Sequence, residues 1–363
     1  MIWSPVFLRA PCGGNTSAKI FPLTKIVISM TPAKSTPLGK DNLPDVLEII
    51  LCTYNRQKML DRTLCSLFAP KSPLRQIPLT VLDNASTDGT SELISRYQER
   101  FAQIRHIRHD RNIGGNANIA RAFEMATKKY LWILCDDDEY DWTYWYEIEQ
   151  ALLSDKYDCI LTERKIDFTD KDLPQIINSL AFVPCGIYKT VHITDTVMSN
   201  IESNIMYSFP HLALGASLLN HQCKFYVPAH TVIKQNVNME FTRGIKEEIH
   251  FRQAHVNLYS GYINSYQMIA DKKLRKRCCD VLYLGKSFYY SMKGFVRSND
   301  DFPYNLADVF WGITFFQKLQ LIAAWLSCKV STLLQYVFSI SNSADRKYKV
   351  IIILGFKRKI KRR

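Results

Sequence analysis

The sequence predicts an α/β fold in which a mostly parallel central sheet is flanked by helices and followed by a helical C-terminal extension. From residue 46 onward, apolar runs of strand length alternate with segments that have a helical period. Strands and helices that alternate at this spacing need right-handed crossovers, which build a parallel sheet. The chain of 363 residues is 47% hydrophobic, enough for one large core or two modest ones.

The first hundred residues of this region supply the regular part of the pattern. Apolar runs predict strands at VLEIILC (46–52), IPLTVLDN (77–84), QIRHIRH (103–109) and YLWILC (130–135). Helical periodicity falls between them, at RQKMLDRTLCSLF (56–68), TDGTSELISRYQERF (87–101) and GNANIARAFEMATKK (115–129). Asp88 and Thr90 are cap-type residues at the start of the second helix.

The pattern loosens after a further predicted strand, YDCILTER (157–164). Helices are expected at 189–205, 209–222 and over most of 243–295, with a strand-like segment at 224–236. These segments suggest a main domain at 46–262, whose regular half (46–145) is an α/β layer of the nucleotide-binding type and whose looser half is 146–262, and a helical region at 263–363. Residues 1–45 contain six prolines between short apolar patches, so they are expected to be disordered.

Basic residues concentrate at the two ends of the chain. Nine Lys or Arg and no acid follow Arg346 inclusively, and residues 1–45 carry a net +3, which leaves about +1 of the total +13 for the rest. This distribution argues against a body shaped around a nucleic acid and favours a cationic tail (346–363) that meets an anionic surface. Ten scattered cysteines without a CxxC pair indicate a reducing, cytoplasmic environment and a chain without structural zinc.

Residues 310–340 are expected to form an amphipathic helix. Leu319, Ile322, Leu326, Val330, Leu333 and Val337 recur every three or four positions, whereas two lysines and three glutamines argue against a transmembrane span. Such a helix beside a basic tail is typical of a protein that lies peripherally on the inner face of the cell membrane. The alternative is a helix that covers the core of its own domain.

Polar loops follow all four of the first strands. They read TYNR, DNASTDGT, DRNIGGN and DDDEYDW, and parallel sheets bind ligands where such loops gather. Asp83 is placed to accept hydrogen bonds from the base of a nucleotide, with Thr53, Asn55 and Arg56 beside it. The acids 136–139 offer hard oxygen ligands for Mn²⁺ or Mg²⁺, although such a run is also common as a solvated turn.

These loops resemble, in order and spacing, the successive motifs of family 2 glycosyltransferases with the GT-A fold, of the bacterial surface-polysaccharide type. The motifs are ILCTYNR, VLDNASTDGT, NIGGNANIARAFEMA and YLWILCDDDE, and the resemblance is close over roughly residues 46–145. It implies that 46–262 is the GT-A catalytic domain, with a nucleotide-binding half (46–145) and an acceptor half (146–262). It implies a nucleotide-diphospho-sugar transferase that moves a sugar from a nucleotide-sugar, with UDP favoured, to a hydroxyl of a glycan or lipid-linked oligosaccharide, with inversion at the anomeric carbon.

The resemblance also implies roles for individual residues. The nucleotide-sugar would be bound by Thr53, Tyr54, Asn55, Arg56, Asp83, Asp88, Asn112, Gly114, Gly115, Asn116, Asp136 and Asp137. Asp136 and Asp138 match the ends of the DxD motif that holds the metal, but the acid run allows a register shifted by one, with Asp137 and Glu139 facing the ion. Cys52 stands where many members of the family have proline.

The general base is expected beyond the DxD loop, and Glu247 and Glu248 are the candidates, with Asp195 behind them. Carboxylates near a helix start are also favoured by the macrodipole alone, so a purely structural role is equally open. His211 is expected to be a packed histidine. Two other classes stay open: a sugar nucleotidyltransferase, which would usually carry a glycine-rich basic first loop, and a non-catalytic nucleotide-binding membrane scaffold.

Overall fold

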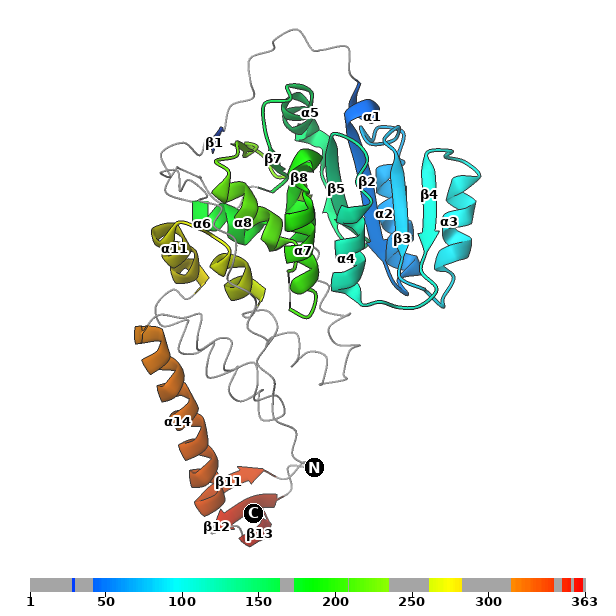
Figure 1. Ribbon diagram of the computed structural model, residues 1–363. Helices are drawn as coiled ribbons and strands as arrows, with labels where there is room; N and C mark the ends of the chain where they lie inside the picture. The colour runs from blue at the N-terminus through cyan, green and yellow to red at the C-terminus, as the bar shows by residue number, and fades with distance from the viewer. Residues whose placement is uncertain are drawn as a thin grey trace, which may run out of the picture.

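A computed structural model describes residues 28–29, 42–163, 173–207, 209–234, 261–282, 315–342, 348–353 and 356–361. Within these residues an eight-stranded sheet has the order β1-β9-β7-β8-β5-β2-β3-β4, with helices packed against it (Figure 1). The strands are β1 (Ile28–Ser29), β2 (Leu47–Thr53), β3 (Leu79–Asp83), β4 (Ile104–Arg108), β5 (Tyr130–Cys135), β7 (Cys159–Leu161), β8 (Gly186–Lys189) and β9 (Phe225–Tyr226). Only β8 runs antiparallel to its neighbours in this sheet. The predicted mostly parallel sheet is confirmed.

The alternation of side chains along the central strands explains why both faces of the sheet are covered. Ile50, Leu131 and Ile133 belong to one hydrophobic cluster, and their chain neighbours Leu51, Trp132 and Leu134 belong to another. Since successive residues of a strand point to opposite faces, a continuous apolar run must be buried on both sides. Helices α2 (Gln57–Leu67), α3 (Thr90–Gln98), α4 (Gly115–Glu124) and α5 (Trp145–Leu153) belong to these layers.

The helix expected at 115–129 ends earlier, at Glu124. The backbone amides of Thr127 and Lys128 donate to the carboxylate of Glu48 in β2, and the Thr127 hydroxyl donates to the same group over 2.9 Å. Amides bound to this side chain are not available to continue the helical ladder. The acid in the first strand therefore determines where the segment leading to β5 begins.

Several other described elements are shorter. These are the helices α1 (Leu43–Val46), α6 (Leu173–Ser179), α7 (Asp195–Ser203), α8 (Leu212–Asn220) and α11 (Lys272–Leu282), the 3-10 turns η2 (Trp142–Tyr144), η4 (Val183–Cys185) and η5 (Thr190–His192), and the antiparallel pair β6 (Glu139–Tyr140) and β10 (Ile233–Lys234).

The helix expected at 189–205 begins only at Asp195. Thr194 is the N-cap residue and its side chain accepts a hydrogen bond from the amide of Val197, while Lys189 completes β8 and η5 follows it. Of the segment 243–295, the structure describes 261–282, where residues 261–267 and α11 are helical. Asp271 accepts a hydrogen bond from the amide of Leu274 and so caps the start of α11.

The two ends of the chain contain more strand than the sequence indicates. Within the expected disordered segment 1–45, Ile28–Ser29 pairs in parallel with β9. Helix α14 (Phe315–Val337) is followed by an antiparallel meander of β11 (Phe338–Asn342), β12 (Tyr348–Ile353) and β13 (Phe356–Lys361). The segment expected to be a basic tail therefore supplies two strands.

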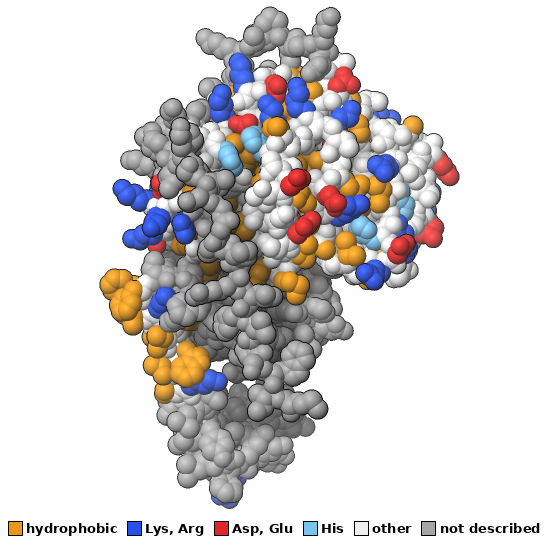
Figure 2. Space-filling view, viewed as in Figure 1, with side chains coloured by type: hydrophobic (Ala, Val, Ile, Leu, Met, Phe, Trp, Pro, Cys, Tyr) orange, Lys and Arg blue, Asp and Glu red, His pale blue; other side chains and the backbone are white. Residues whose placement is uncertain are grey.

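Helix α14 has two apolar faces. Leu321, Ala324 and Cys328 are buried and join one of the core clusters. The predicted stripe of Leu319, Ile322, Leu326 and Val330 is 44–52% exposed, and Figure 2 shows hydrophobic side chains standing out along this helix. In the part of the chain that the structure describes, α14 and the other helices are too short or too polar to cross a bilayer. The helix covers its own domain with one face and leaves the predicted stripe open.

Candidate active site

Three parallel strands bring the polar loops to one edge of the sheet. In the pairing register Thr53 lies opposite Asp83, and Cys52 lies opposite Cys135. Neighbouring strands are about 4.8 Å apart, so Asp83, Thr53 and Asp136 stand next to one another in three adjacent strand exits. The expectation that these loops lie together at one edge of the sheet is confirmed.

Asp136 is the most constrained acid of the run. Its side chain is 2% exposed, and its two oxygens accept hydrogen bonds from the Thr53 hydroxyl at 2.6 Å and from Nη1 of Arg56 at 2.8 Å. The Thr63 hydroxyl of α2 donates to its backbone carbonyl over 2.9 Å. Burial raises the pKa of Asp136 above its ordinary value, although the positive charge of Arg56 opposes that effect.

The other acids of the run alternate between inside and outside. Asp138 is 4% exposed, like Asp136, whereas Asp137 is half-buried and Glu139 is exposed in β6. Nη1 of Arg56 also lies 3.0 Å from Asp137, and Arg62 donates to the Asp137 carbonyl over 2.7 Å. The guanidinium of Arg56 thus holds two of the four carboxylates together, and Asp136 and Asp138 form the buried pair.

Asp83 ends β3 as a fully buried carboxylate, 0% exposed. It accepts hydrogen bonds from the amide of Ser86 at 2.8 Å and from the Ser91 hydroxyl at 3.4 Å. His106 Nε2 and Arg108 Nε of β4 lie 3.5 and 3.7 Å away. Burial would raise the pKa of Asp83, but the nearby His106 and the hydrogen bond from Ser86 outweigh it and lower the pKa below its ordinary value. Asp83 is therefore an anion at neutral pH.

Asn55 and Asp88 connect the first and second loops. Asn55, at a φ of 51°, accepts from the Thr87 amide at 2.7 Å, and its own amide donates to the Ser86 hydroxyl at 2.9 Å. Asp88 accepts from the amide of Gln57 at 3.1 Å and from that of Thr90 at 3.1 Å. Both side chains help to hold the two loops together. Tyr54, which directly precedes Asn55, is exposed.

The third loop is organised by amide side chains. Asn112 accepts from the Asn84 side chain and from the Gly114 amide, each at 2.8 Å, and Gly114 has a φ of +90° that favours glycine. Gly115 has open space where a Cβ would lie. Asn116 donates instead to the carbonyls of Ile205 and Tyr207, at 3.0 and 2.7 Å, and so ties α4 to the chain that follows α7.

The candidate general bases and His211 lie in different parts of the chain. Glu247 and Glu248 lie outside the described residues. Asp195 begins α7 three residues after His192, at the edge of the sheet opposite the carboxylate loop, so it is far from the site. His211 is buried, its Nε2 lies 2.8 Å from the Leu180 carbonyl, and burial lowers its pKa to about 4. The packed reading of His211 is confirmed.

Several residues of the site were not expected from the sequence. Arg62 and Thr63 hold the acid loop from α2, Asn84 and Ser86 organise the second and third loops, and His106 and Arg108 stand beside Asp83. Alternation in the strand of 103–109 offered one signal, since His106 and Arg108 share a face with Ile104.

The donor set of this edge suits a hard divalent cation. Asp136 and Asp138 supply carboxylate oxygens, the ligands that Mn²⁺ and Mg²⁺ prefer, and no thiol or imidazole is needed. A cation beside Asp136 would also offset the burial that raises the pKa of this acid. The residues present therefore fit such an ion.

Comparison with known proteins gives results at three levels. Residues 48–214 match the family model described as glycosyl transferase family 2. Abequosyltransferase RfbV of Salmonella typhimurium is 31% identical over 134 residues, which cover 37% of this chain and 39% of that protein. Validoxylamine A glucosyltransferase of Streptomyces hygroscopicus is 36% identical over 56 residues, covering 15% of this chain and 13% of that protein.

Two solved structures align over most of the chain at low sequence identity. The mannosyltransferase PcManGT from Pyrobaculum calidifontis, in complex with GDP-Man and Mn²⁺, has a TM-score of 0.49 at 13% identity, covering 80% of this chain and 87% of the other. TarS 1-349 from S. aureus has a TM-score of 0.45 at 13% identity, covering 86% of this chain and 98% of the other.

Proposed function

We propose that this chain, whose residues 48–214 match the family model described as glycosyl transferase family 2, is an inverting enzyme that transfers a sugar from a nucleotide-diphosphate sugar to a hydroxyl of a lipid-linked glycan. UDP is the favoured nucleotide and surface polysaccharide synthesis the favoured setting. The abequosyltransferase among its relatives supports sugar transfer as the reaction class. That alignment spans 39% of the relative, so it does not support a particular substrate or acceptor. The proposals for both rest on this chain's own residues.

The observation that carries the proposal is the joining of the first and fourth loops through buried carboxylate contacts. Asp136 binds Thr53 and Arg56, which lie at the end of β2 and in the loop that follows it, about eighty residues earlier in the chain. With Asp83 in the adjacent strand exit, the edge offers an anionic group for the nucleotide base and a buried acid pair that would hold the divalent ion of the diphosphate. A nucleotide diphosphate needs both kinds of group within one site.

Asp136 and Asp138 would hold the divalent ion. When bound, the ion supplies Lewis-acid stabilisation of the negative charge that develops on the leaving diphosphate. Thr53 orients Asp136 through its 2.6 Å hydrogen bond, and Thr63 fixes the backbone of the same residue. A carboxylate whose rotamer is held by such partners loses little freedom on binding a ligand.

Arg56 neutralises the acid loop when no nucleotide is bound. One of its nitrogens lies within 3.0 Å of both Asp136 and Asp137, which relieves the repulsion between those carboxylates. A guanidinium also binds phosphate oxygens well, so Arg56 is suited to turn from the acids toward the diphosphate. Glu247 or Glu248 stays the proposed general base that takes the proton of the acceptor hydroxyl.

The open face of α14 supports a membrane setting for the acceptor. The stripe of Leu319, Ile322, Leu326 and Val330 is about half exposed, with Trp325 beside it and Lys318 and Lys329 on the same helix. Apolar residues that face the acyl chains and lysines that meet anionic head groups bind a helix in the plane of the interface. An enzyme held there would meet a lipid-anchored acceptor on the inner face of the cell membrane.

Two other activities make different predictions for the same edge. A sugar nucleotidyltransferase would consume a sugar phosphate and a nucleoside triphosphate, and a non-catalytic scaffold would bind the nucleotide without turning over the donor. The first loop, TYNRQ, lacks the glycine-rich basic signature that favours the former. The buried, fully organised acid pair favours a working site over a scaffold.

The proposal is tested by a screen of nucleotide-sugars for thermal stabilisation and slow donor hydrolysis with Mn²⁺ present. At least one nucleotide-diphosphate sugar should raise the melting midpoint and release its nucleotide diphosphate. If pyrophosphate is released from a nucleoside triphosphate and a sugar phosphate instead, the enzyme is a nucleotidyltransferase. Binding without hydrolysis or transfer to any glycan lipid would indicate the scaffold.

A further inference from the structure

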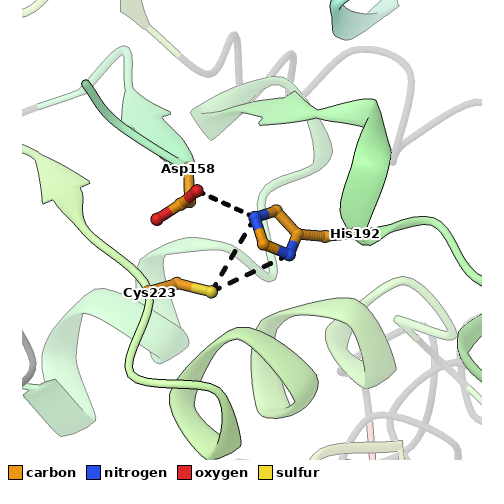
Figure 3. Close-up of side chains that lie close together, drawn as sticks. All are labelled: Asp158, His192 and Cys223. Atoms are coloured by element: carbon orange, nitrogen blue, oxygen red, sulfur yellow. Dashed lines mark hydrogen bonds and ion pairs between the residues drawn. The ribbon is translucent and has the colours of Figure 1, made fainter. Parts of the chain in front are cut away.

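A second group of potential ligands lies at the edge of the sheet opposite the carboxylate loop. Asp158 directly precedes β7, and Cys223 comes two residues before β9. His192 ends η5, which follows β8. Because β8 runs antiparallel to β7, its end lies at the edge where β7 and β9 begin. Figure 3 shows the three side chains converging from these separate segments.

The distances among the three side chains are close to those of a metal site. His192 Nε2 lies 2.8 Å from Asp158 Oδ1, and Cys223 Sγ lies 3.9 Å from both ring nitrogens of His192. One ligand atom from each residue lies within 4.8 Å of the others. A tetrahedral zinc ion with bonds of about 2.0 to 2.3 Å would place its ligand atoms roughly 3.5 Å apart. Small side-chain rotations would bring both distances to that value.

The backbone around these ligands is held by strand pairing. The Asp158 amide donates to the Lys224 carbonyl over 2.8 Å, and the Lys224 amide donates back to the Asp158 carboxylate over 2.7 Å. The Lys189 amide donates to the Asp158 carbonyl over 2.9 Å, which ties the end of β8 to the same point. The segments that carry Asp158 and Cys223 are therefore fixed before any ion arrives.

We propose that Asp158, His192 and Cys223 bind a zinc ion that fastens the starts of β7 and β9 to the turn leading into α7. Thiolate, imidazole and carboxylate together suit Zn²⁺, whereas the all-oxygen set of the acid loop suits Mn²⁺ or Mg²⁺. A cavity of about 340 Å³, lined by His192, Thr194, Asn200, Ser217, Asn220 and His221, adjoins the group. A water molecule from this cavity would complete the fourth position.

A nucleophilic role for the same three residues is less consistent with the structure. Cys223 is 4% exposed, and burial, with the negative charge of Asp158, raises the pKa of its thiol to about 12. A thiol with that pKa stays protonated at neutral pH and attacks poorly. A metal ion displaces this proton on binding, which a histidine 3.9 Å away does not.

The test is a cobalt titration of the purified full-length chain. One equivalent of Co²⁺ should produce a thiolate-to-cobalt charge-transfer band, and Zn²⁺ should abolish it by displacement. Cys223→Ser should remove the band, whereas Cys65→Ser, which changes an exposed cysteine, should keep it. A wild-type chain without the band, or a Cys223→Ser chain that retains it, overturns the proposal.

A second variant keeps the test valid if Cys223→Ser does not fold. His192 lies at a half-buried turn. His192→Gln should weaken Zn²⁺ binding at least about tenfold, since losing even an outer partner of a metal ligand costs that much. Competition with a chromophoric chelator measures the affinity. Unchanged affinity in a folded His192→Gln chain overturns the proposal. Asp138→Ala should leave the cobalt band intact, which separates this site from the proposed nucleotide site.

Discussion

At the scale of single residues, the acid loop is a balance between burial and one guanidinium. Asp136 is almost fully buried, and burial raises its pKa despite the ion pair with Arg56. Removing the positive partner of a buried carboxylate costs more than the pair itself contributes, because the remaining charge is left unpaired. Arg56 therefore matters for stability when no ligand is present.

Arg56→Gln should lower the free energy of unfolding by about 1–3 kcal/mol, a range reduced because Arg56 is partly exposed. Mn²⁺ should restore more of the melting midpoint in this variant than it adds to the wild type, because the ion replaces the lost charge. Arg62→Gln is the matched control, since Arg62 donates only to the carbonyl of Asp137. Equal losses in the two variants, with no added effect of Mn²⁺, would contradict this role.

Asp83 gives a pH-dependent contribution of known sign. Its folded-state pKa is lowered, so its stabilisation is complete above the unfolded value of about 3.9 and is lost as the pH falls through the folded value. Wild type should therefore exceed Asp83→Asn in melting midpoint at neutral pH, and the difference should shrink below about pH 4. Thermal melts across this range measure it, and a difference that grows with acidity would show that the pKa is raised instead.

At the scale of elements, the sequence was sufficient to predict the strands and loops whose structure depends on local residues. The strands of 46–135 follow from apolar runs that need burial on both faces, and their polar exits follow from parallel pairing. The early end of α4 depends on Glu48, about eighty residues away, and β8 turns antiparallel through pairing with distant strands. Local periodicity does not contain such long-range contacts.

The same limit applies to the candidate site. Thr53, Arg56, Asp83 and the acid run were expected from their positions at strand exits, and the structure brings them to one edge. Asn55, Asp88 and Asn116 are predicted to contact the nucleotide, and that stays a prediction; in the structure their side chains bind backbone groups of nearby segments. Whether a loop residue binds a ligand or holds its loop depends on partners that are remote in the chain.

The third loop offers a test at this scale with a built-in control. Gly114 has a φ of +90°, so Gly114→Ala should lower the free energy of unfolding by about 1–3 kcal/mol and loosen the contact between Asn84 and Asn112. Gly115 lies beside it at the start of α4, with open space at its Cβ position, so Gly115→Ala should be neutral or slightly stabilising. Urea unfolding of both variants measures the difference, and equal effects would show that backbone strain is not the cause.

At the scale of the whole molecule, distinct surfaces are assigned to distinct partners. We propose the carboxyl edge of the sheet for the nucleotide, the opposite edge for a zinc ion, and α14 for the membrane interface. The exposed stripe of α14 is separate from the face that packs on the core. This separation allows the membrane contact to be altered without disturbing the buried residues.

Flotation with anionic vesicles tests the membrane contact. The double variant Leu326→Asp, Val330→Asp should lower partitioning at least about tenfold, since burying each apolar side chain contributes roughly 1.5–3 kcal/mol. The matched control, Val191→Asp with Met206→Asp, changes two exposed apolar residues elsewhere and should float like the wild type. If the α14 variant also floats like the wild type, the helix does not anchor the enzyme.

The most direct measurement of the central claim is calorimetric titration of UDP into the wild type, Asp138→Ala and Glu139→Ala, with and without Mn²⁺. Asp138 is buried beside Asp136 whereas Glu139 is exposed, so they separate the two possible registers of the acid run. We expect Mn²⁺ to strengthen UDP binding in the wild type and in Glu139→Ala, and to have no effect in Asp138→Ala. An Mn²⁺ effect that survives Asp138→Ala, or that disappears in Glu139→Ala, would contradict the assignment of the metal to Asp136 and Asp138.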